Sequence, residues 1–266
     1  MDLRPIGIFD SGLGGLTVFK EVVNIMPNED IIYFGDTARI PYGSKSKETV
    51  TKFSIQNTRF LLSKNVKIVI IACNTASAFT YETLKNEFDI PLIGVIEPGA
   101  KAAAEATKSK RIGVIGTEGT ISSGSFERKI KEFDSSITVY SKACPLFVPL
   151  VEEGWIDNEI TYLVAKEYLK EFFDTGIDTL VLGCTHYPFL QEVIKRVLPN
   201  VTLINPAYET AKKAFKLLSE RDMLSDKKEP YYHFFASDNL KKFESVASIF
   251  LNEKIKCEEK IDIEKY

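Results

Sequence analysis

The 266-residue sequence lacks any apolar run close to the roughly 20 residues that a bilayer-spanning helix requires. Its opening segment, Met1–Pro5, also lacks the apolar core of a secretory signal, and a short strand pattern follows at once. We therefore expect a cytoplasmic protein that does not insert into a membrane.

Basic blocks are absent as well, and the formal net charge is −3, so the sequence does not favour a nucleic-acid-binding surface. The four cysteines include no Cys-x-x-Cys pair, which argues against a dithiol redox centre. A structural zinc site needs about four ligands at short spacings, and the obvious candidates are only Cys73, Cys184 and His186. Without an export signal, we expect all four thiols to be reduced.

Two of the cysteines end closely similar sequence segments. The segments Lys67–Cys73 and Asp178–Cys184 each run through apolar residues into a cysteine, and a hydroxyl-bearing turn follows each of them. A second pair of similar segments is Pro5–Asp10 and Arg111–Gly116. Buried strands all look apolar, so one such match carries little weight. Two such matches in the same order indicate an internal duplication, with one site built from two related halves.

Short apolar runs alternate with longer helical patterns up to about residue 220. This alternation is typical of α/β folds with parallel sheets and right-handed crossovers. A helix is expected over 47–64, with Asn65 as its left-handed cap, and another over Pro206–Glu220. The helix over 157–174 is expected to bury Ile160, Leu163, Val164 and Phe172. The tail, with a strand at 231–236 and a helix at 238–251, has no counterpart in the second half, and we expect it to pack on the first.

Polar residues follow several of the predicted strands. Ligands collect beyond the carboxyl ends of strands in open parallel sheets. If two similar domains face each other, these ends meet in one cleft, and the two thiols approach a bound molecule from opposite sides. The residues at the strand ends are Asp10, Ser11, Asp36, Thr37, Cys73, Asn74, Thr75, Gly116, Thr117, Cys184, Thr185 and His186.

Proton transfer at a stereocentre needs one acid–base group on each face of the carbon, and two opposed thiols fit this need. A thiol titrates near pH ~8.5 and can serve as base or acid. Nucleophilic catalysis would leave the second thiol unexplained. Helix N-termini expected just after Cys73 and Cys184 would lower the thiol pKa values, and Asp10 and His186 could tune the thiols or relay protons. Cys144 is interpreted, like Cys257, as a buried small hydrophobe.

The glycine-rich turn after the first strand resembles a dinucleotide-binding loop only superficially. Asp10 and Thr17 occupy two of the positions where that motif has glycine, and a carboxylate there would repel a pyrophosphate. Asp36 could still act as the ribose-binding acid, which leaves a weak nucleotide interpretation open. The favoured interpretation is that the glycines expose backbone N–H groups to a smaller anion such as a carboxylate. Glu152 is either a solvated acid or a residue of the cleft.

Five ordered motifs resemble those of the glutamate racemases, cofactor-independent members of the aspartate/glutamate racemase superfamily. The resemblance covers almost the whole chain, from Ile6 to about residue 215. The motifs are Gly7–Gly15, Asp36–Gly43, Ala72–Ser77, Gly183–Pro188 and Glu209–Ala211.

The resemblance implies an α/β fold of two pseudo-symmetric domains, each a parallel-type sheet flanked by helices, with the active site in the cleft between them. We expect residues 1–97 and 207–266 to form the first domain and residues 98–206 the second. The resemblance also implies a homodimer that uses neither pyridoxal phosphate nor a metal.

The implied activity is interconversion of L-glutamate and D-glutamate by a two-thiol α-proton transfer, which would supply D-glutamate for peptidoglycan. Cys73 would deprotonate D-glutamate and Cys184 L-glutamate, with Asp10 and His186 as catalytic neighbours. The residues implied to bind substrate are Asp10, Ser11, Tyr42, Gly43, Asn74, Thr75, Thr185 and His186.

Three alternatives remain. One is a racemase of another acidic amino acid such as aspartate. A second is a non-catalytic protein that binds an acidic amino acid, and a third is a gyrase-binding or other regulatory protein on the same fold. Because different residues follow the two thiols, a racemase of this sequence is expected to show unequal kinetics in its two directions.

Overall fold

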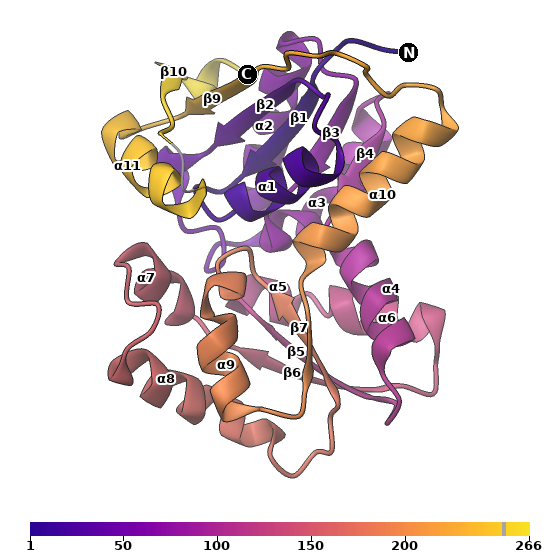
Figure 1. The fold of residues 1–266 in the computed structure, drawn as a ribbon, viewed down its shortest axis with the longest axis vertical. Coiled ribbons are helices and arrows are strands. Elements are labelled where there is room, and N and C mark those ends of the chain that lie inside the picture. The colour runs from indigo at the N-terminus through magenta and orange to yellow at the C-terminus, as the bar shows by residue number, and fades with distance from the viewer. Residues whose placement is uncertain (252–253) are drawn as a thin grey trace.

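Two parallel sheets organise the protein in the computed structural model, which describes residues 1–251 and 254–266 (Figure 1). The first sheet has the order β10-β9-β2-β1-β3-β4 and the second the order β6-β5-β7-β8. The strands of the first are β1 (Ile6–Asp10), β2 (Ile31–Gly35), β3 (Ile68–Ile71), β4 (Leu92–Gly94), β9 (Tyr232–Ala236) and β10 (Cys257–Lys260). Those of the second are β5 (Arg111–Gly116), β6 (Thr138–Ala143), β7 (Thr179–Gly183) and β8 (Thr202–Ile204).

Helices cover both faces of each sheet, which confirms the expected α/β architecture (Figure 1). The α-helices are α1 (Leu16–Ile25), α2 (Lys47–Ser63), α3 (Asn74–Glu87), α4 (Ile96–Ala106), α5 (Glu118–Ser122), α6 (Ser125–Phe133), α7 (Phe147–Glu152), α8 (Glu159–Leu169), α9 (Gln191–Val197), α10 (Pro206–Glu220) and α11 (Leu240–Leu251). Short 3₁₀ helices are η1 (Thr37–Arg39), η2 (Lys170–Phe172), η3 (Tyr187–Leu190) and η4 (Ile263–Lys265).

Strand β1 illustrates why these apolar runs fold as central strands. Its side chains alternate between the two faces of the sheet, so Ile6 and Ile8 pack with α1, α10 and α11. Phe9 joins the opposite layer, with α2 and α3. Both layers exclude water, which is why the strand reads as a nearly continuous apolar run rather than an alternating one.

The C-terminal tail extends the first sheet, because β9 pairs with β2 and β10 pairs with β9. The chain passes between the two sheets twice, between β4 and α4 and again between β8 and α10 (Figure 1). On this basis we propose that residues 1–97 with 207–266 form one domain and residues 98–206 the other.

Local sequence signals identified several elements correctly. Helix α10 has the predicted limits, and Asn65 follows α2 in the left-handed region at φ 56°. The predicted burial of Ile160 and Leu163 is wrong, because they are 51% and 55% exposed.

Helix α8 instead buries the stripe Thr161, Ala165 and Leu169, which is rotated by one residue from the predicted one. The helix packs against β6, α7 and α9, and the side chains that it buries there are on the whole smaller than the predicted ones. The helix therefore offers two neighbouring stripes, and the one that packs against the core is the less apolar of the two. Phe172 is buried as predicted.

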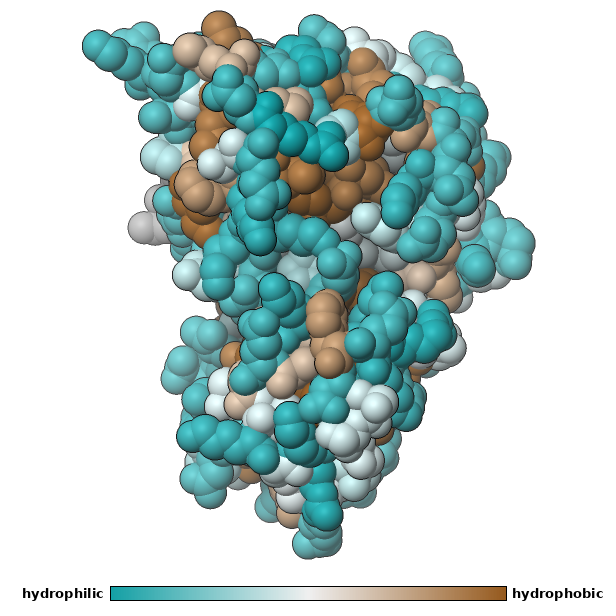
Figure 2. Space-filling model, turned by 90° about the vertical axis from the view of Figure 1, so that its right-hand side faces the viewer, coloured by the Kyte–Doolittle hydropathy of each residue, from teal (hydrophilic) through white to brown (hydrophobic). Residues whose placement is uncertain are grey.

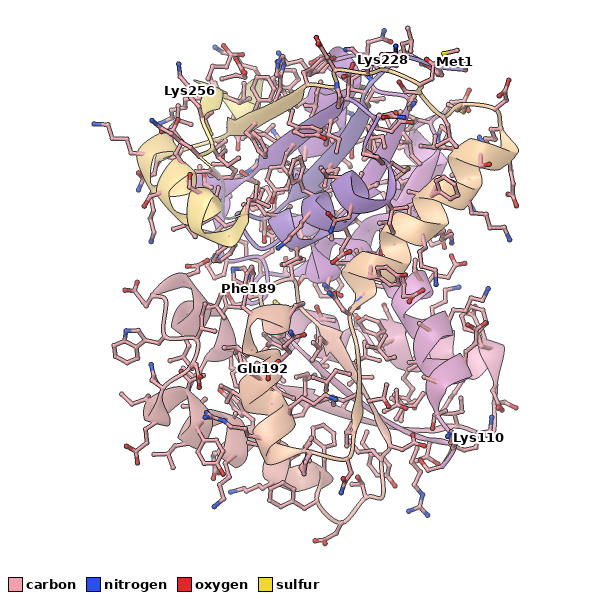
Figure 3. The ribbon with its side chains drawn as sticks, viewed as in Figure 1. Met1, Lys110, Phe189, Glu192, Lys228 and Lys256 are labelled. Carbon is pink, nitrogen blue, oxygen red and sulfur yellow. The ribbon has the colours of Figure 1, made fainter. Side chains whose placement is uncertain are left out.

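The face on the side of α4, α6 and α10 is mostly hydrophilic, with apolar side chains gathered in its upper half (Figure 2). Within residues 1–251 and 254–266, every helix is too short or too polar to cross a membrane. Where the two halves meet, Phe189 of η3 lies against α11 (Figure 3), and its ring centroid is 4.1 Å from that of Phe250.

Candidate active site

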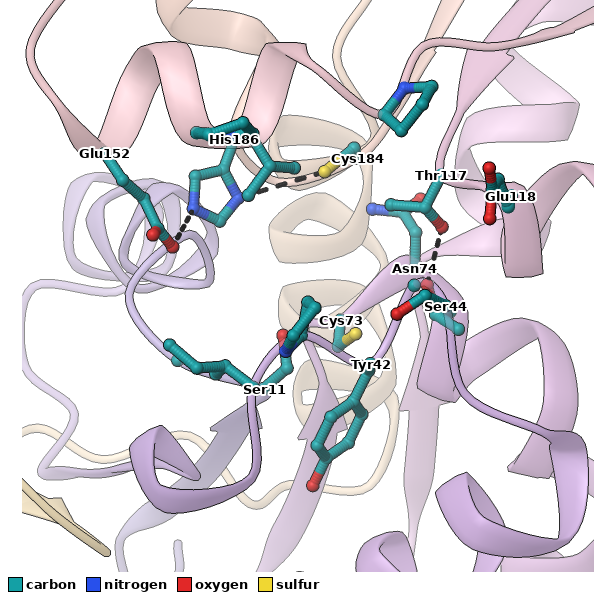
Figure 4. Close-up of a pocket in the computed structure, with 18 residues that line it drawn as sticks. Ser11, Tyr42, Ser44, Cys73, Asn74, Thr117, Glu118, Glu152, Cys184 and His186 are labelled. Atoms are coloured by element: carbon teal, nitrogen blue, oxygen red, sulfur yellow. Dashed lines mark hydrogen bonds and ion pairs between the residues drawn. The ribbon is translucent and has the colours of Figure 1, made fainter.

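A cavity of about 500 Å³ lies where the carboxyl ends of the two sheets face each other (Figure 4). Residues from both halves of the chain line it, so neither half alone forms the site. The lining residues of the first half are Ser11, Gly12, Ile40, Pro41, Tyr42, Gly43, Ser44, Cys73, Asn74 and Thr75. Those of the second half are Thr117, Glu118, Pro145, Val148, Pro149, Glu152, Cys184 and His186.

The two predicted thiols enter this cavity from opposite sides (Figure 4). Cys73 follows β3 and caps α3, and its Sγ accepts a hydrogen bond from the N–H of Ala76 at 3.5 Å. Cys184 directly follows β7. Each residue is only 6% exposed, so the thiols are reached through the cavity. This arrangement places one protonatable sulfur on each side of a molecule bound between them.

The pKa of Cys73 differs from the expectation. The helix N-terminus was expected to lower it, but burial and the neighbouring Asp10 carboxylate raise it to about 12. The N–H of Ala76 and the Ser11 side chain oppose that rise without overcoming it. At neutral pH Cys73 is therefore a thiol, the form that donates a proton.

Cys184 has a different environment. Its Sγ lies 3.9 Å from Nδ1 of His186, and Nε2 of the same ring lies 3.5 Å from Oε1 of Glu152 (Figure 4). Burial lowers the pKa of His186, but contacts with Cys184 and Glu152 outweigh it and raise the pKa to about 10. The expected α-helix does not begin beside this thiol, because η3 starts at Tyr187 and α9 only at Gln191. The imidazolium of His186 supplies positive charge beside Cys184, as the N-terminus of α3 does beside Cys73.

Asp10 ends β1 behind the cavity rather than on its wall. It is fully buried, its Oδ2 accepts the N–H of Gly12 at 2.9 Å, and its Oδ1 has no partner. Burial raises the pKa of Asp10, while His186 and the turn N–H groups oppose the rise. The backbone N–H groups of this turn were expected to bind an anion such as a carboxylate. The N–H of Gly12 already binds the carboxylate of Asp10.

Close packing explains two glycines of the same turn. A Cβ on Gly15 would lie 2.5 Å from the Cβ of Asp10. A Cβ on Gly14 would lie 2.2 Å from Oγ1 of Thr185 and 2.6 Å from the ring of His186. Only glycine lets this turn approach both the catalytic aspartate candidate and the opposite half of the chain.

The loop before α2, residues 40–44, lines the cavity. The Tyr42 hydroxyl donates to Oδ2 of Asp36, accepts from Nδ2 of Asn57, and points away from the cavity (Figure 4). Next to it, the carbonyl oxygen of Gly43 accepts the N–H of Gly119 from the other half at 2.8 Å. The hydroxyl of Tyr42 is thus bound within the protein, and contact of Tyr42 with substrate stays a prediction.

Thr75 also contacts the opposite half. Its Oγ1 lies 2.8 Å from Oγ1 of Thr117 and 3.2 Å from Oγ1 of Thr120. These hydroxyls satisfy one another, so Thr75 contributes to closure of the site as well as to its wall. By contrast, Oδ1 of Asn74 is buried without a partner and is available to a ligand donor.

The cavity gathers most of the predicted site residues and adds others. Asp10 and Thr185 do not line it, although both contact residues that support it. Glu152, left open by the sequence, does line it. Thr117 carried a signal, because it follows a predicted strand, whereas Val148 carried none. The remaining lining residues that sequence reasoning missed are Gly12, Ile40, Pro41, Ser44, Glu118, Pro145 and Pro149.

Metal-binding side chains do not gather in the described part of the chain. No group of three or more His, Cys, Asp and Glu residues there could hold a metal ion.

Comparison with known proteins identifies the family. Residues 6–214 match the family model described as Asp/Glu/Hydantoin racemase. The chain belongs to this family. The glutamate racemase of Geobacter metallireducens is 49% identical over 257 residues, covering 96% of this chain and 95% of that protein. The glutamate racemase of Thermoanaerobacter sp. strain X514 is 47% identical over 267 residues, covering both chains completely.

Solved structures of racemases support the same assignment. The glutamate racemase of Francisella tularensis, in complex with D-glutamate, superposes with a TM-score of 0.95 at 44% identity and full coverage of both chains. An aspartate racemase homologue from Pyrococcus horikoshii OT3 covers 81% of this chain with a TM-score of 0.60 at 16% identity, which shows the fold alone.

Proposed function

We propose that the protein is an isomerase that interconverts L-glutamate and D-glutamate by proton transfer between two thiols. The observation that carries the proposal is the pair of buried cysteines, Cys73 and Cys184, that enter one cavity from opposite halves of the chain. Racemisation removes the α-hydrogen from one face of the carbon and returns a proton to the other. A two-sided site of this kind supplies an acid and a base at the same time.

The electrostatics of the site fit the two roles. For L-glutamate, Cys184 removes the α-proton and Cys73 delivers its own proton to the opposite face, leaving a thiol on Cys184 and a thiolate on Cys73. For D-glutamate the direction reverses. Protonated Cys73 is the acid of the first direction, and the imidazolium of His186 lies beside Cys184. Glu152 and Asp10 stabilise that imidazolium.

The polar lining suits an acidic amino acid. The unpaired Oδ1 of Asn74 can accept from the substrate's ammonium group, and the hydroxyl of Ser11 can donate to a carboxylate. The charge on His186 favours a negatively charged ligand. By binding the ammonium and carboxylate groups, these side chains position the α-carbon between the two sulfurs.

Glutamate is favoured over aspartate as the substrate. Relatives named glutamate racemase match nearly the whole chain at 46–49% identity. The aspartate racemase of Picrophilus torridus is only 15% identical. A non-catalytic acidic-amino-acid-binding protein would have no use for two opposed thiols. Aspartate racemisation faster than glutamate racemisation would favour the aspartate alternative.

The decisive experiment incubates each glutamate enantiomer with purified, metal-free protein in deuterated water, without pyridoxal phosphate. Optical rotation should decay as deuterium enters the α-position. Cys73→Ala and Cys184→Ala should each abolish racemisation, whereas the matched control Cys144→Ala should not, because Cys144 is buried outside the cavity. Full-rate racemisation by either active-site variant would refute the two-thiol mechanism.

Family membership supports the biological setting of the proposal. The product D-glutamate would serve peptidoglycan synthesis and so maintain the cell wall and cell shape, and the enzyme would act in the cytoplasm as a homodimer. Expression of the chain should relieve the D-glutamate requirement of a bacterium that lacks its own racemase. Light scattering of the purified protein should give twice the monomer mass.

A further inference from the structure

The wall of the cavity formed by residues 40–44 is held from behind. These residues line the cavity, yet the hydroxyl of Tyr42 points away from it and is bound to Asp36 and Asn57 (Figure 4). The partners of that hydroxyl do not line the cavity. The position of the loop depends on contacts that no ligand touches.

Arg39 is the centre of those contacts. Its Nε donates to Oδ2 of Asp36 at 2.8 Å, and its Nη1 donates to Oε1 of Gln56 at 2.5 Å. Its Nη2 donates to Oδ1 of Asn57 at 3.1 Å. The guanidinium also lies over the ring of Phe53, with Cζ 4.0 Å from the centroid. With its side chain only 10% exposed, Arg39 is a fully engaged, nearly buried fork rather than a surface charge.

The last residues of the chain complete the arrangement. Oε1 of Glu264, in η4, accepts from Nη1 of Arg39 at 3.0 Å. After β9, Oγ of Ser237 donates to Oδ1 of Asp36 at 2.9 Å and accepts the N–H of Ala38 at 2.8 Å. The C-terminal tail thus contacts residues 36–39, directly before the loop 40–44, from two places, although the tail itself lies outside the cavity.

We propose that Arg39 is a positioning residue, which holds the Asp36, Tyr42 and Asn57 side chains so that the loop 40–44 keeps the shape of the substrate-binding wall. Glu264 supports Arg39 from the C-terminus. This inference rests on the proposed racemase function for its substrate, glutamate.

The consequence of removing Arg39 follows from burial. Asp36 is fully buried, and without the guanidinium its carboxylate keeps only neutral partners. Burial already raises the pKa of Asp36, with Arg39 the foremost opposing influence. The carboxylate of Asp36 must then gain a water molecule or a proton, and the loop must shift to admit it. Such a shift weakens contacts that are made equally before and during proton transfer, so KM should change more than kcat.

The test compares Arg39→Gln with Arg39→Lys and Tyr42→Phe. Arg39→Gln should raise KM for both enantiomers roughly tenfold, with kcat within about threefold of wild type. Arg39→Lys should be intermediate, because an ammonium keeps the charge but not the fork. Tyr42→Phe should also raise KM, although its hydroxyl faces away from the cavity. Calorimetric Kd values for D-glutamate should rise in parallel.

Arg59→Gln is the matched control. Arg59 also joins an acid and the C-terminus, donating to Glu87 at 2.8 Å and to the carbonyl oxygen of Tyr266 at 3.3 Å, but it does not reach the loop. Its KM and Kd should stay at wild-type values.

Unchanged KM and Kd in the Arg39 variants, with only a lower melting temperature, would overturn the inference. If Arg39→Gln does not fold, unchanged constants in Tyr42→Phe would overturn it instead. A wild-type protein that binds D-glutamate without racemising it would contradict the proposed function alone, since Kd would still test Arg39.

Discussion

Replacing Gly14 with alanine tests whether the two halves must approach closely for proton transfer. The added Cβ would lie 2.2 Å from Oγ1 of Thr185 and 2.6 Å from Nδ1 and Cε1 of His186, whereas ordinary contact begins at 3.4 Å. The opposite half must therefore retreat by about 1 Å at the turn that carries Cys184. A displacement of that size can slow a reaction by about 10²-fold when the reacting groups are held near contact.

The assay is racemisation in both directions, with kcat and KM determined separately. We expect kcat/KM of Gly14→Ala to fall by about 10²-fold, equivalent to about 2.7 kcal/mol of transition-state free energy. Because enantiomers have equal free energies in water, kcat/KM must stay equal in the two directions. The unequal kinetics expected from the different surroundings of Cys73 and Cys184 can appear only in kcat and KM taken separately.

Gly176→Ala serves as the control for lost stability. Gly176 adopts φ +70°, and a Cβ there would meet only the flexible tip of Arg111, far from the cavity. Its strain should cost about 1–2 kcal/mol of unfolding free energy without changing kcat/KM. Full activity of Gly14→Ala, or an equal loss in both variants, would refute the reasoning.

Three further outcomes follow from buried charges. Alkylation of Cys73 near neutral pH should be slow and should rise about tenfold per pH unit, and Asp10→Asn should accelerate it by lowering the thiol pKa, as mass spectrometry can show. The raised pKa of His186 stabilises the fold below pH 6.5, and this contribution should be lost as pH rises through about 10, so urea curves of wild type and His186→Gln should converge there. Lys67→Met should cost about 3–5 kcal/mol in urea unfolding by stranding Glu29, whose Oε2 lies 2.6 Å from Nζ of Lys67, and adding Glu29→Gln should recover much of the loss.

Local sequence patterns were enough to predict many of the helices and strands. Helix α10 could be delimited because Asn205 and Pro206 are a strong start signal and its apolar residues have a helical period. Strand β10 could not, because its exposed charged residues resemble a loop until the edge of β9 pairs with them. The buried face of α8 was misjudged for a similar reason, since neighbouring elements chose between two stripes.

By itself the sequence determined the chemistry available to this protein. Two strands that end in cysteine, with polar turns after them, predict a two-sided thiol site because parallel strands present their carboxyl ends at one edge. The tertiary structure alone decided what surrounds each sulfur. Asp10 lies behind the wall, the hydroxyl of Tyr42 faces Asp36, and Cys73 holds its proton through burial. Solvent exclusion and partner geometry arise only when distant segments pack together, and these properties raise the pKa of Cys73.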